Sequence, residues 1–568
     1  MRFSGVRRGA LLAALLALPA LGALPARAQL AQPEPDTGRE EKAAVAARRH
    51  LVVAANPLAA EAGLAMLRAG GGAVDAAIAV QLVLGLVEPQ SSGIGGGAFL
   101  LHWSSAERRA RSYDGREAAP AAARPDRFLD ASGQPLAFLD AVASGRSVGV
   151  PGVLRMLQMA HRRHGRLAWA KLFEPAIALA ERGFPLQRRL QALAQGDPLL
   201  RRDAAARRLY YDAEGRAKPP GTKIVNAQYA RTLRRIARHG ADAFYRGETA
   251  TAIVRALAAQ RVPGDMTIED LARYAAFERD PVCGPYRGWR VCGVGPPSSG
   301  GVALLQMLGI LERAGFHRAG PHSEEAVHLF SEAARLAYAD RARYIADPAF
   351  APQPVKGLLD PEYLDRRARL LGRRAPGPVA PGEPGGGTTH LSVVDERGDA
   401  VALSSSIEHA FGSRIMVAGF LLNNQLTDFA FDPRAAGVPV ANRVEPGKRP
   451  RSTMSPMLAF DADGALRLVA GSAGGAAIVN HVAKLVVAVR DWGLDVQEAI
   501  ALPNFGSTGG PTLLERGTRY QELGEALAAR GHVLDFARMT SGLHAIERHA
   551  GGWRGGADPR REGAARGD

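Results

Sequence analysis

The stretch Gly385-Gly386-Gly387-Thr388-Thr389-His390-Leu391-Ser392-Val393-Val394-Asp395 decides how the rest of this sequence is interpreted. Three glycines lead into two threonines, and the residues that follow have the alternation typical of a strand. A threonine that becomes an N-terminus carries a free α-amine beside its own hydroxyl. That amine can accept the hydroxyl proton, which activates the oxygen as a nucleophile. The alternative is a glycine loop that simply enters a strand, and these residues alone leave both interpretations open.

The chain before this stretch has the composition of a linker. Residues 371–387 are rich in proline and glycine, a composition typical of an exposed, mobile connection. A junction that is cut should have this character.

The chain after it predicts a hairpin. Strands are expected from Thr389 to Asp395 and from Ala400 to Ser406, with the turn between them at residues 396–399. If Asp395 pairs with Ala400, Thr389 lies opposite Ser406. The hydroxyls of Ser404 and Ser406 then lie near the new terminus, although a slip of one residue would change this.

The N-terminus carries an export signal. Arginines at positions 2, 7 and 8 precede the apolar run from Gly9 to Leu24, and Ala26-Arg27-Ala28 supplies a small-residue cleavage site. We expect residues 1–28 to be a signal peptide and the mature protein to be periplasmic or secreted. No later apolar stretch approaches 18 residues, so no membrane span is expected in the mature form.

Composition favours a folded protein without a nucleic-acid partner. Of the 568 residues, 46% are hydrophobic and 23% charged, enough apolar residues for a sizeable core. The formal charge is +16. However, the arginines are scattered and aromatic residues make up only 6%, whereas nucleic-acid binding favours clustered basic residues with interleaved aromatics.

The two cysteines, Cys283 and Cys292, lie in a second predicted hairpin. With Arg287-Gly288 as a two-residue turn, Tyr286 pairs with Trp289 and Cys283 faces Cys292. In an oxidising compartment we expect them to form a disulfide; two reduced core cysteines are the alternative.

Several further elements follow from local signals. Asn56-Pro57 caps a helix that ends at Gly70-Gly71-Gly72, and the next helix is apolar on every side and therefore buried. The remaining expected elements are a strand from Ala98 to Trp103, mainly helices from Gly152 to Tyr274, and helices from Val302 to Leu311, Glu324 to Tyr344 and Ile478 to Val489.

Taken in order, these motifs resemble the γ-glutamyltransferase (glutathione hydrolase) family of N-terminal nucleophile hydrolases. The resemblance covers about residues 52–561. The segments that carry it are Gly72 to Ala77, Gly115-Arg116-Glu117, Pro296 to Gly301, Thr388 to Asp395, Leu422 to Phe429, Lys448 to Pro456 and Gly471 to Gly475.

The resemblance implies a four-layer αββα sandwich made as one precursor. Cleavage between Gly387 and Thr388 would give a large subunit, residues 29–387, and a small catalytic subunit, residues 388–568, which stay together as a heterodimer. Thr388 would then transfer the γ-glutamyl group of glutathione or a related amide to water or to an amino acid or peptide. Neither a metal nor a cofactor is implied.

The resemblance also implies roles for individual residues. Ser406 would form a hydrogen bond with the nucleophile Thr388, and the N–H groups of Gly474 and Gly475 would bind the oxyanion. The substrate carboxylate would lie on Arg116, Ser452 and Thr453, and its ammonium group on Glu408, Gln425 and Asp428. The segment of residues 430–446 is short and contains no tyrosine. Many relatives cover the substrate with a lid that carries a tyrosine, so a more open site is expected here.

Two other functions remain open. A relative that removes glutaryl groups from β-lactam side chains would share the fold, but a glutaryl group has no ammonium to pair with Asp428. A non-catalytic exported binding protein would also share it.

Overall fold

Two antiparallel sheets form the centre of the fold. The structure is a computed structural model that describes residues 38–375 and 387–568, all within the compact unit Gln32–Asp568. The predicted signal peptide and most of the predicted linker lie outside the described residues. The first sheet contains, in spatial order, β1 (Val45–Ala47), β22 (Gly552–Ala557), β21 (His544–His549), β17 (Leu466–Gly471), β16 (Met457–Phe460), β9 (Trp289–Gly293) and β8 (Val282–Tyr286).

The second sheet holds the stretch around which the sequence is organised. Its spatial order is β23 (Ala564–Gly567), β2 (Leu51–Ala54), β10 (Gly387–Val394), β11 (Ala400–Glu408), β3 (Gly97–Ser104), β4 (Arg109–Gly115) and β7 (Phe277–Arg279). β10 and β11 are therefore central strands.

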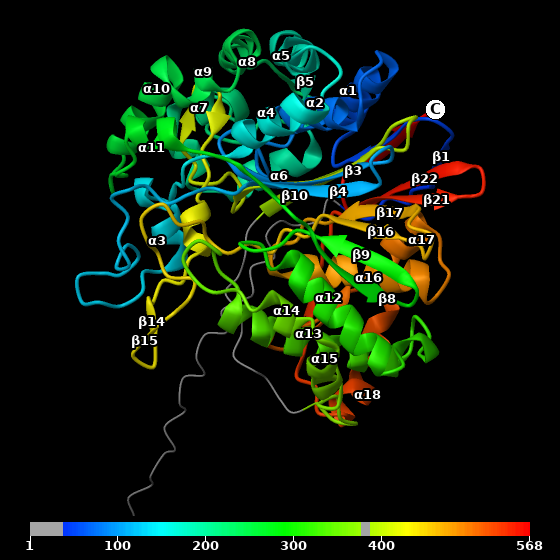
Figure 1. The fold of residues 1–568 in the computed structure, drawn as a ribbon. Coiled ribbons are helices and arrows are strands. Elements are labelled where there is room, and N and C mark those ends of the chain that lie inside the picture. The colour runs from blue at the N-terminus through cyan, green and yellow to red at the C-terminus, as the bar shows by residue number, and fades with distance from the viewer. Residues whose placement is uncertain (1–37, 376–386) are drawn as a thin grey trace, which may run out of the picture. The chain divides into compact units, whose positions relative to one another are not determined.

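Helices cover the outer face of each sheet (Figure 1). The second sheet is covered by α1 (Pro57–Arg68), α2 (Ala73–Val87) and α4 (Val153–His164), with α5 (Glu174–Arg182) and α8 (Ala227–His239) farther out. The first sheet is covered by α12 (Gly300–Arg313), α16 (Ile478–Arg490) and α17 (Val496–Ala501), with α13 (Glu324–Tyr344) behind α12.

The hydrophobic core has the same layering. One cluster joins the second sheet to its helices, another joins the first sheet to its helices, and a third, with Phe99, Trp103 and Leu458, fills the space between the sheets. α2 is buried along its whole length because strands lie on one side and helices on the other. The αββα sandwich implied by the resemblance is thus the observed architecture.

Local signals predicted most of these elements. The Asn56 side chain accepts a hydrogen bond from the N–H of Leu58 at the start of α1, and α13 has the expected bounds. β8 and β9 pair in the predicted register, and a disulfide joins Cys283 to Cys292 across them. None of the helices in the described ranges is long and apolar enough to cross a membrane.

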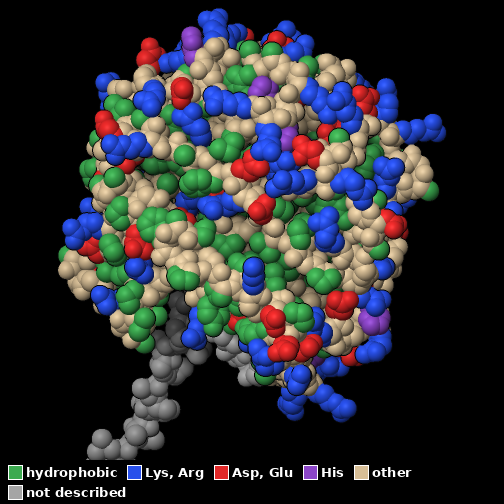
Figure 2. All heavy atoms as spheres, viewed as in Figure 1, with side chains coloured by type: hydrophobic (Ala, Val, Ile, Leu, Met, Phe, Trp, Pro, Cys, Tyr) green, Lys and Arg blue, Asp and Glu red, His purple; other side chains and the backbone are tan. Residues whose placement is uncertain are grey.

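Basic side chains are spread over the visible surface. In Figure 2, Lys and Arg are interspersed with acidic, hydrophobic and other residues and do not form one continuous field. The positive net charge is therefore distributed over this face.

Candidate active site

β10 begins at the predicted cut and pairs with β11 one residue out of the predicted register. Val394, not Asp395, faces Ala400, so Thr389 lies opposite Ser405. The predicted pairing of Thr389 with Ser406 is wrong. The reason is local: Oδ1 of Asp395 accepts the N–H groups of Arg397 and Asp399 and keeps Asp395 inside the turn.

A bulge at Thr388 nevertheless brings the Ser406 hydroxyl to the predicted cut. The register shifts between Gly387 and Thr389, and Gly387 lies opposite Glu408. The Ser406 hydroxyl donates to the carbonyl oxygen of Gly387 at 2.5 Å, and its oxygen accepts the N–H of Glu408 at 2.8 Å. Ser404 lies elsewhere, 2.9 Å from Nδ1 of His390, so the expectation that its hydroxyl lies near the terminus is wrong.

A small cavity of about 20 Å³ lies beside Thr388. Its lining residues come from segments far apart in the chain and include nine of the predicted site residues. The ten lining residues are Arg116, Thr388, Ser406, Glu408, Gln425, Asp428, Ser452, Thr453, Met454 and Gly475. All of them except Met454 were predicted as site residues. The fold therefore brings together the threonine and the two sets of residues predicted to bind the substrate carboxylate and ammonium groups.

Arg116, just after β4, is fully buried and held by backbone carbonyls. Its guanidinium donates to the carbonyl oxygens of Pro450 at 3.0 Å and Arg451 at 2.8 Å, and to Oδ2 of Asp428 at 2.5 Å. Because the guanidinium is fixed in this way, it presents a positive charge in a defined position beside the cavity.

Acceptor oxygens line the same cavity. Gln425 donates to Asp428 at 2.7 Å, and Asn424 donates to one oxygen of Glu408. The remaining oxygens, Oε1 of Glu408 and Oε1 of Gln425, are buried without a hydrogen-bond partner among the described residues. Unpartnered buried acceptors of this kind suit a cationic ligand.

Glu408 is unusual in both backbone and charge. Its φ of 78° lies in the left-handed region, which is rare for residues other than glycine. Burial, with the nearby negative charge of Asp428, raises the pKa of its carboxyl to about 8. At neutral pH, Glu408 is therefore mostly protonated.

Ser452 and Thr453 connect the cavity to the glycine loop. The Ser452 oxygen accepts the N–H of Met454 at 3.0 Å, and the Thr453 hydroxyl donates to the carbonyl of Gly475 at 3.0 Å. Gly474 and Gly475 have φ values of 116° and 54°. Their N–H groups donate no hydrogen bond within residues 38–375 and 387–568, so both can serve an anion.

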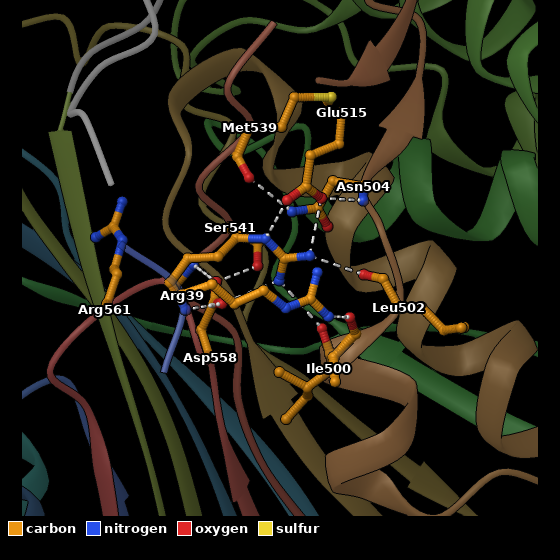
Figure 3. A network of polar contacts seen from close by, with 12 residues as sticks. Arg39, Ile500, Leu502, Asn504, Glu515, Met539, Ser541, Asp558 and Arg561 are labelled. Atoms are coloured by element: carbon orange, nitrogen blue, oxygen red, sulfur yellow. Dashed lines mark hydrogen bonds and ion pairs between the residues drawn. The ribbon is translucent and has the colours of Figure 1, made fainter. Parts of the chain in front are cut away.

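A buried polar network supports the chain behind this loop (Figure 3). The Ser472 hydroxyl lies 2.8 Å from the carbonyl oxygen of Ser541, whose own hydroxyl donates to Asp558. Asp558 accepts from Arg560, which also forms two bonds to Glu515. Sequence reasoning missed these residues because the contacts join segments far apart in the chain.

None of the residues that line the cavity comes from the segment of residues 430–446. Phe431 stacks on Phe128 with ring centres 4.7 Å apart, and β14 (Arg434–Ala435) and β15 (Val438–Pro439) form a small hairpin beyond it. Aromatic packing at Phe431 thus fixes the start of this segment, and the expectation of a more open site stays a prediction. Sequence reasoning also missed Asn424, which holds Glu408, and Met454. Within the described ranges, no group of three or more His, Cys, Asp or Glu side chains could hold a metal ion.

Comparison with known proteins gives consistent matches. Residues 59–567 match the family model described as gamma-glutamyltranspeptidase. The glutathione hydrolase proenzyme of Bacillus subtilis strain 168 is 34% identical, over 98% of this chain and 97% of the relative.

Acylases are about as similar. The acylase ACY 1 proenzyme of Pseudomonas sp. strain SE83 is 35% identical, over 89% of this chain and 91% of the relative. The crystal structure of cephalosporin acylase from Bacillus halodurans superposes with a TM-score of 0.83 and 28% identity, and covers 94% of this chain and 99% of that one.

Proposed function

Because this chain belongs to the gamma-glutamyltranspeptidase family, and is therefore a hydrolase or transferase, we propose that it is an exported γ-glutamyltransferase and glutathione hydrolase. It matures by cutting itself between Gly387 and Thr388. The observation that carries this proposal is the cavity itself, which Thr388 lines together with the fixed guanidinium of Arg116 and the unpartnered acceptor oxygens of Glu408 and Gln425.

Maturation starts from the bond that Ser406 already contacts. The Thr388 hydroxyl oxygen bonds to the Gly387 carbonyl carbon, the amide C–N bond breaks, and the nitrogen takes the hydroxyl proton. Water then hydrolyses the resulting ester. The Ser406 hydroxyl, 2.5 Å from the Gly387 oxygen, stabilises the negative charge that develops there. The products are residues 29–387 and residues 388–568, which remain together because their strands share both sheets.

Turnover uses the terminus that maturation creates. The Thr388 α-amine takes the hydroxyl proton as the oxygen attacks the γ-carbonyl carbon of the donor. The N–H groups of Gly474 and Gly475 bind the oxyanion, and the leaving amine departs with a proton. Water or an acceptor amine then releases the γ-glutamyl group from Thr388.

Charge favours this donor over a glutaryl group. Both have a carboxylate for Arg116, Ser452 and Thr453, but only the γ-glutamyl group has an ammonium. That ammonium can donate hydrogen bonds to the oxygens of Glu408, Gln425 and Asp428. A glutaryl donor would leave Oε1 of Glu408 and Oε1 of Gln425 without a partner, which costs free energy in a buried site.

The first experiment tests maturation. The wild-type protein should purify as two chains with Thr388 at a new N-terminus, whereas Thr388→Ala should remain one inactive chain. Thr389→Ala is the matched control: its hydroxyl is buried without a hydrogen-bond partner among the described residues, so this variant should be cut and active. A wild-type protein that stays uncut would support the non-catalytic binding protein instead.

The second experiment tests specificity. Hydrolysis of γ-glutamyl p-nitroanilide should be faster than hydrolysis of glutaryl p-nitroanilide. Faster glutaryl hydrolysis would assign the protein to the acylases. The export proposal rests on residues 1–28. To test it, the protein is expressed in a bacterial host, its location is determined by cell fractionation, and the N-terminus of the mature chain is sequenced.

A further inference from the structure

We propose that His481 is a positioning residue that aims the Gly474 N–H at the substrate oxyanion. This inference rests on the proposed function, since it assumes that Gly474 and Gly475 form the oxyanion hole. His481 does not line the cavity and lies outside the sequence motifs that carry the family resemblance.

His481 lies directly behind the glycine loop. It is in the first half of α16, and its ring points back toward the start of that helix, as helical side chains do. Nδ1 lies 3.2 Å from the carbonyl oxygen of Ala473 and 3.3 Å from Oγ of Ser472, and that Oγ lies 2.6 Å from the same carbonyl oxygen.

The ring also fills the space beside Gly474. A Cβ atom built on Gly474 would lie 2.6 Å from Cε1 and 2.8 Å from Nδ1 of His481. Only glycine therefore allows the loop to pass this close to the ring, and the positive φ of Gly474 has the same requirement.

The charge and tautomer of His481 follow from its surroundings. The side chain is buried, and burial together with the nearby Lys484 lowers its pKa to about 3, so the ring is neutral at working pH. We assign the proton to Nδ1, because the ring then donates to the Ala473 carbonyl oxygen, whereas a proton on Nε2 would have no acceptor among the described residues. Nε2 has no hydrogen-bond partner among the described residues.

Fixing the Ala473 carbonyl fixes the neighbouring N–H. The C=O of Ala473 and the N–H of Gly474 belong to one planar trans peptide, in which they point in opposite directions. Because the imidazole holds the carbonyl toward the core, the Gly474 N–H points away from it, and it makes no hydrogen bond within the described protein. Without this hydrogen bond, the positive-φ glycines Gly474 and Gly475 would let the peptide rotate.

The main test compares three variants of the processed enzyme. His481→Leu removes the donor; His481→Asn places an amide N–H near the position of Nδ1; His481→Gln places it near Nε2. We expect kcat for γ-glutamyl p-nitroanilide to fall roughly 10- to 100-fold in His481→Leu and His481→Gln, because loss of one oxyanion donor typically costs 10²–10³-fold. His481→Asn should stay within about fivefold of the wild type.

KM separates positioning from general damage. Ground-state binding depends on Arg116 and the acceptor oxygens, so KM should change less than about twofold in all three variants. Wild-type kcat in His481→Leu would overturn the inference. Equal losses in His481→Asn and His481→Gln, or a rise in KM that matches the fall in kcat, would overturn it too. If His481→Leu does not fold, the comparison of Asn with Gln still decides.

Failure of the proposed function looks different. A wild-type enzyme that prefers glutaryl p-nitroanilide would refute the γ-glutamyl assignment. The three variants can then be compared with that substrate, because every acyl transfer at Thr388 passes through an oxyanion.

Discussion

Glu408 combines the strongest local constraints in the site. This one residue has a left-handed backbone conformation, and its carboxyl group has an unpartnered oxygen and a raised pKa. Strain and burial of this kind persist only where the surroundings enforce them, and they cluster at functional sites. The bulge at Thr388 and the bond from Asn424 are those surroundings here.

The raised pKa predicts how substrate binding depends on pH. Below about pH 8 the free Glu408 carboxyl is protonated, and an ammonium group binds better to its ionised form. For a donor whose amine stays charged over this range, KM should therefore fall, up to about 25-fold, as pH rises from 6.5 to 8.5. Steady-state kinetics over this range measure the effect.

Matched variants identify the group responsible. Glu408→Gln should remove the dependence of KM on pH. Glu117→Gln should keep it, because Glu117 is also buried with a pKa of about 8 but does not line the cavity. A flat KM profile in the wild type would show that Glu408 is not the titrating group.

At the scale of the element, the pairing of β10 with β11 places the Ser406 hydroxyl on the carbonyl oxygen of Gly387, at the proposed cleavage site. Ser406→Ala should slow maturation on the order of 10²-fold, because the hydroxyl that stabilises the developing oxyanion is lost. Ser406→Thr keeps a hydroxyl and should mature at a similar rate. Cleavage can be followed by gel electrophoresis of freshly made precursor.

The neighbouring serine is a control for this prediction. Ser405 lies on the opposite face of β11, is also buried, and donates to the carbonyl oxygen of Gly97 at 3.2 Å. Ser405→Ala should therefore mature normally although it also removes a buried hydroxyl. Equal slowing in Ser405→Ala and Ser406→Ala would indicate damage to the strand and not loss of an oxyanion donor.

The same pair of strands shows how far the sequence could predict the structure. The strands, α1 and α13 follow from glycines, caps and apolar spacing, which are local signals. The register was wrong by one residue because it depends on the Asp395 side chain bonding inside its own turn. The bulge that restores Ser406 to the site depends on packing across the sheet, which no local pattern encodes.

Residues that act through contacts between distant segments could also not be predicted from local sequence patterns. Site residues were predicted where a family motif marks them, as at Arg116 and Asp428. His481 and the network of Asp558, Arg560 and Glu515 carry no motif. Their partners lie on other elements, so their environment exists only in the folded chain.

At the scale of the whole molecule, many ionisable groups are buried without charge. Seven of the described histidines have a pKa lowered mainly by burial: His102, His164, His390, His409, His481, His532 and His544. A second set of carboxyl groups has a raised pKa, among them Glu88 and Glu117, each about 8.

The two sets act in opposite directions on stability. A histidine with a lowered pKa contributes stability above about pH 6.5 and loses it as pH falls. A carboxyl with a raised pKa contributes stability fully below about pH 4.5 and loses it as pH rises through its folded-state pKa. Between pH 4.5 and 6.5 the two contributions therefore oppose each other.

This balance predicts the shape of acid unfolding. Below about pH 4.5 the raised carboxyls no longer respond to pH, while the histidines and the carboxyls with lowered pKa, such as Asp558, all favour the unfolded state. The free energy of unfolding, measured with urea, should change little from pH 6.5 to 5 and fall steeply below 4.5. His544→Gln should reduce the steep slope by about one proton, or about 1.4 kcal/mol per pH unit. His239→Gln, at an exposed position, should leave it unchanged, and a steep loss already between pH 6.5 and 5 would contradict the proposed balance.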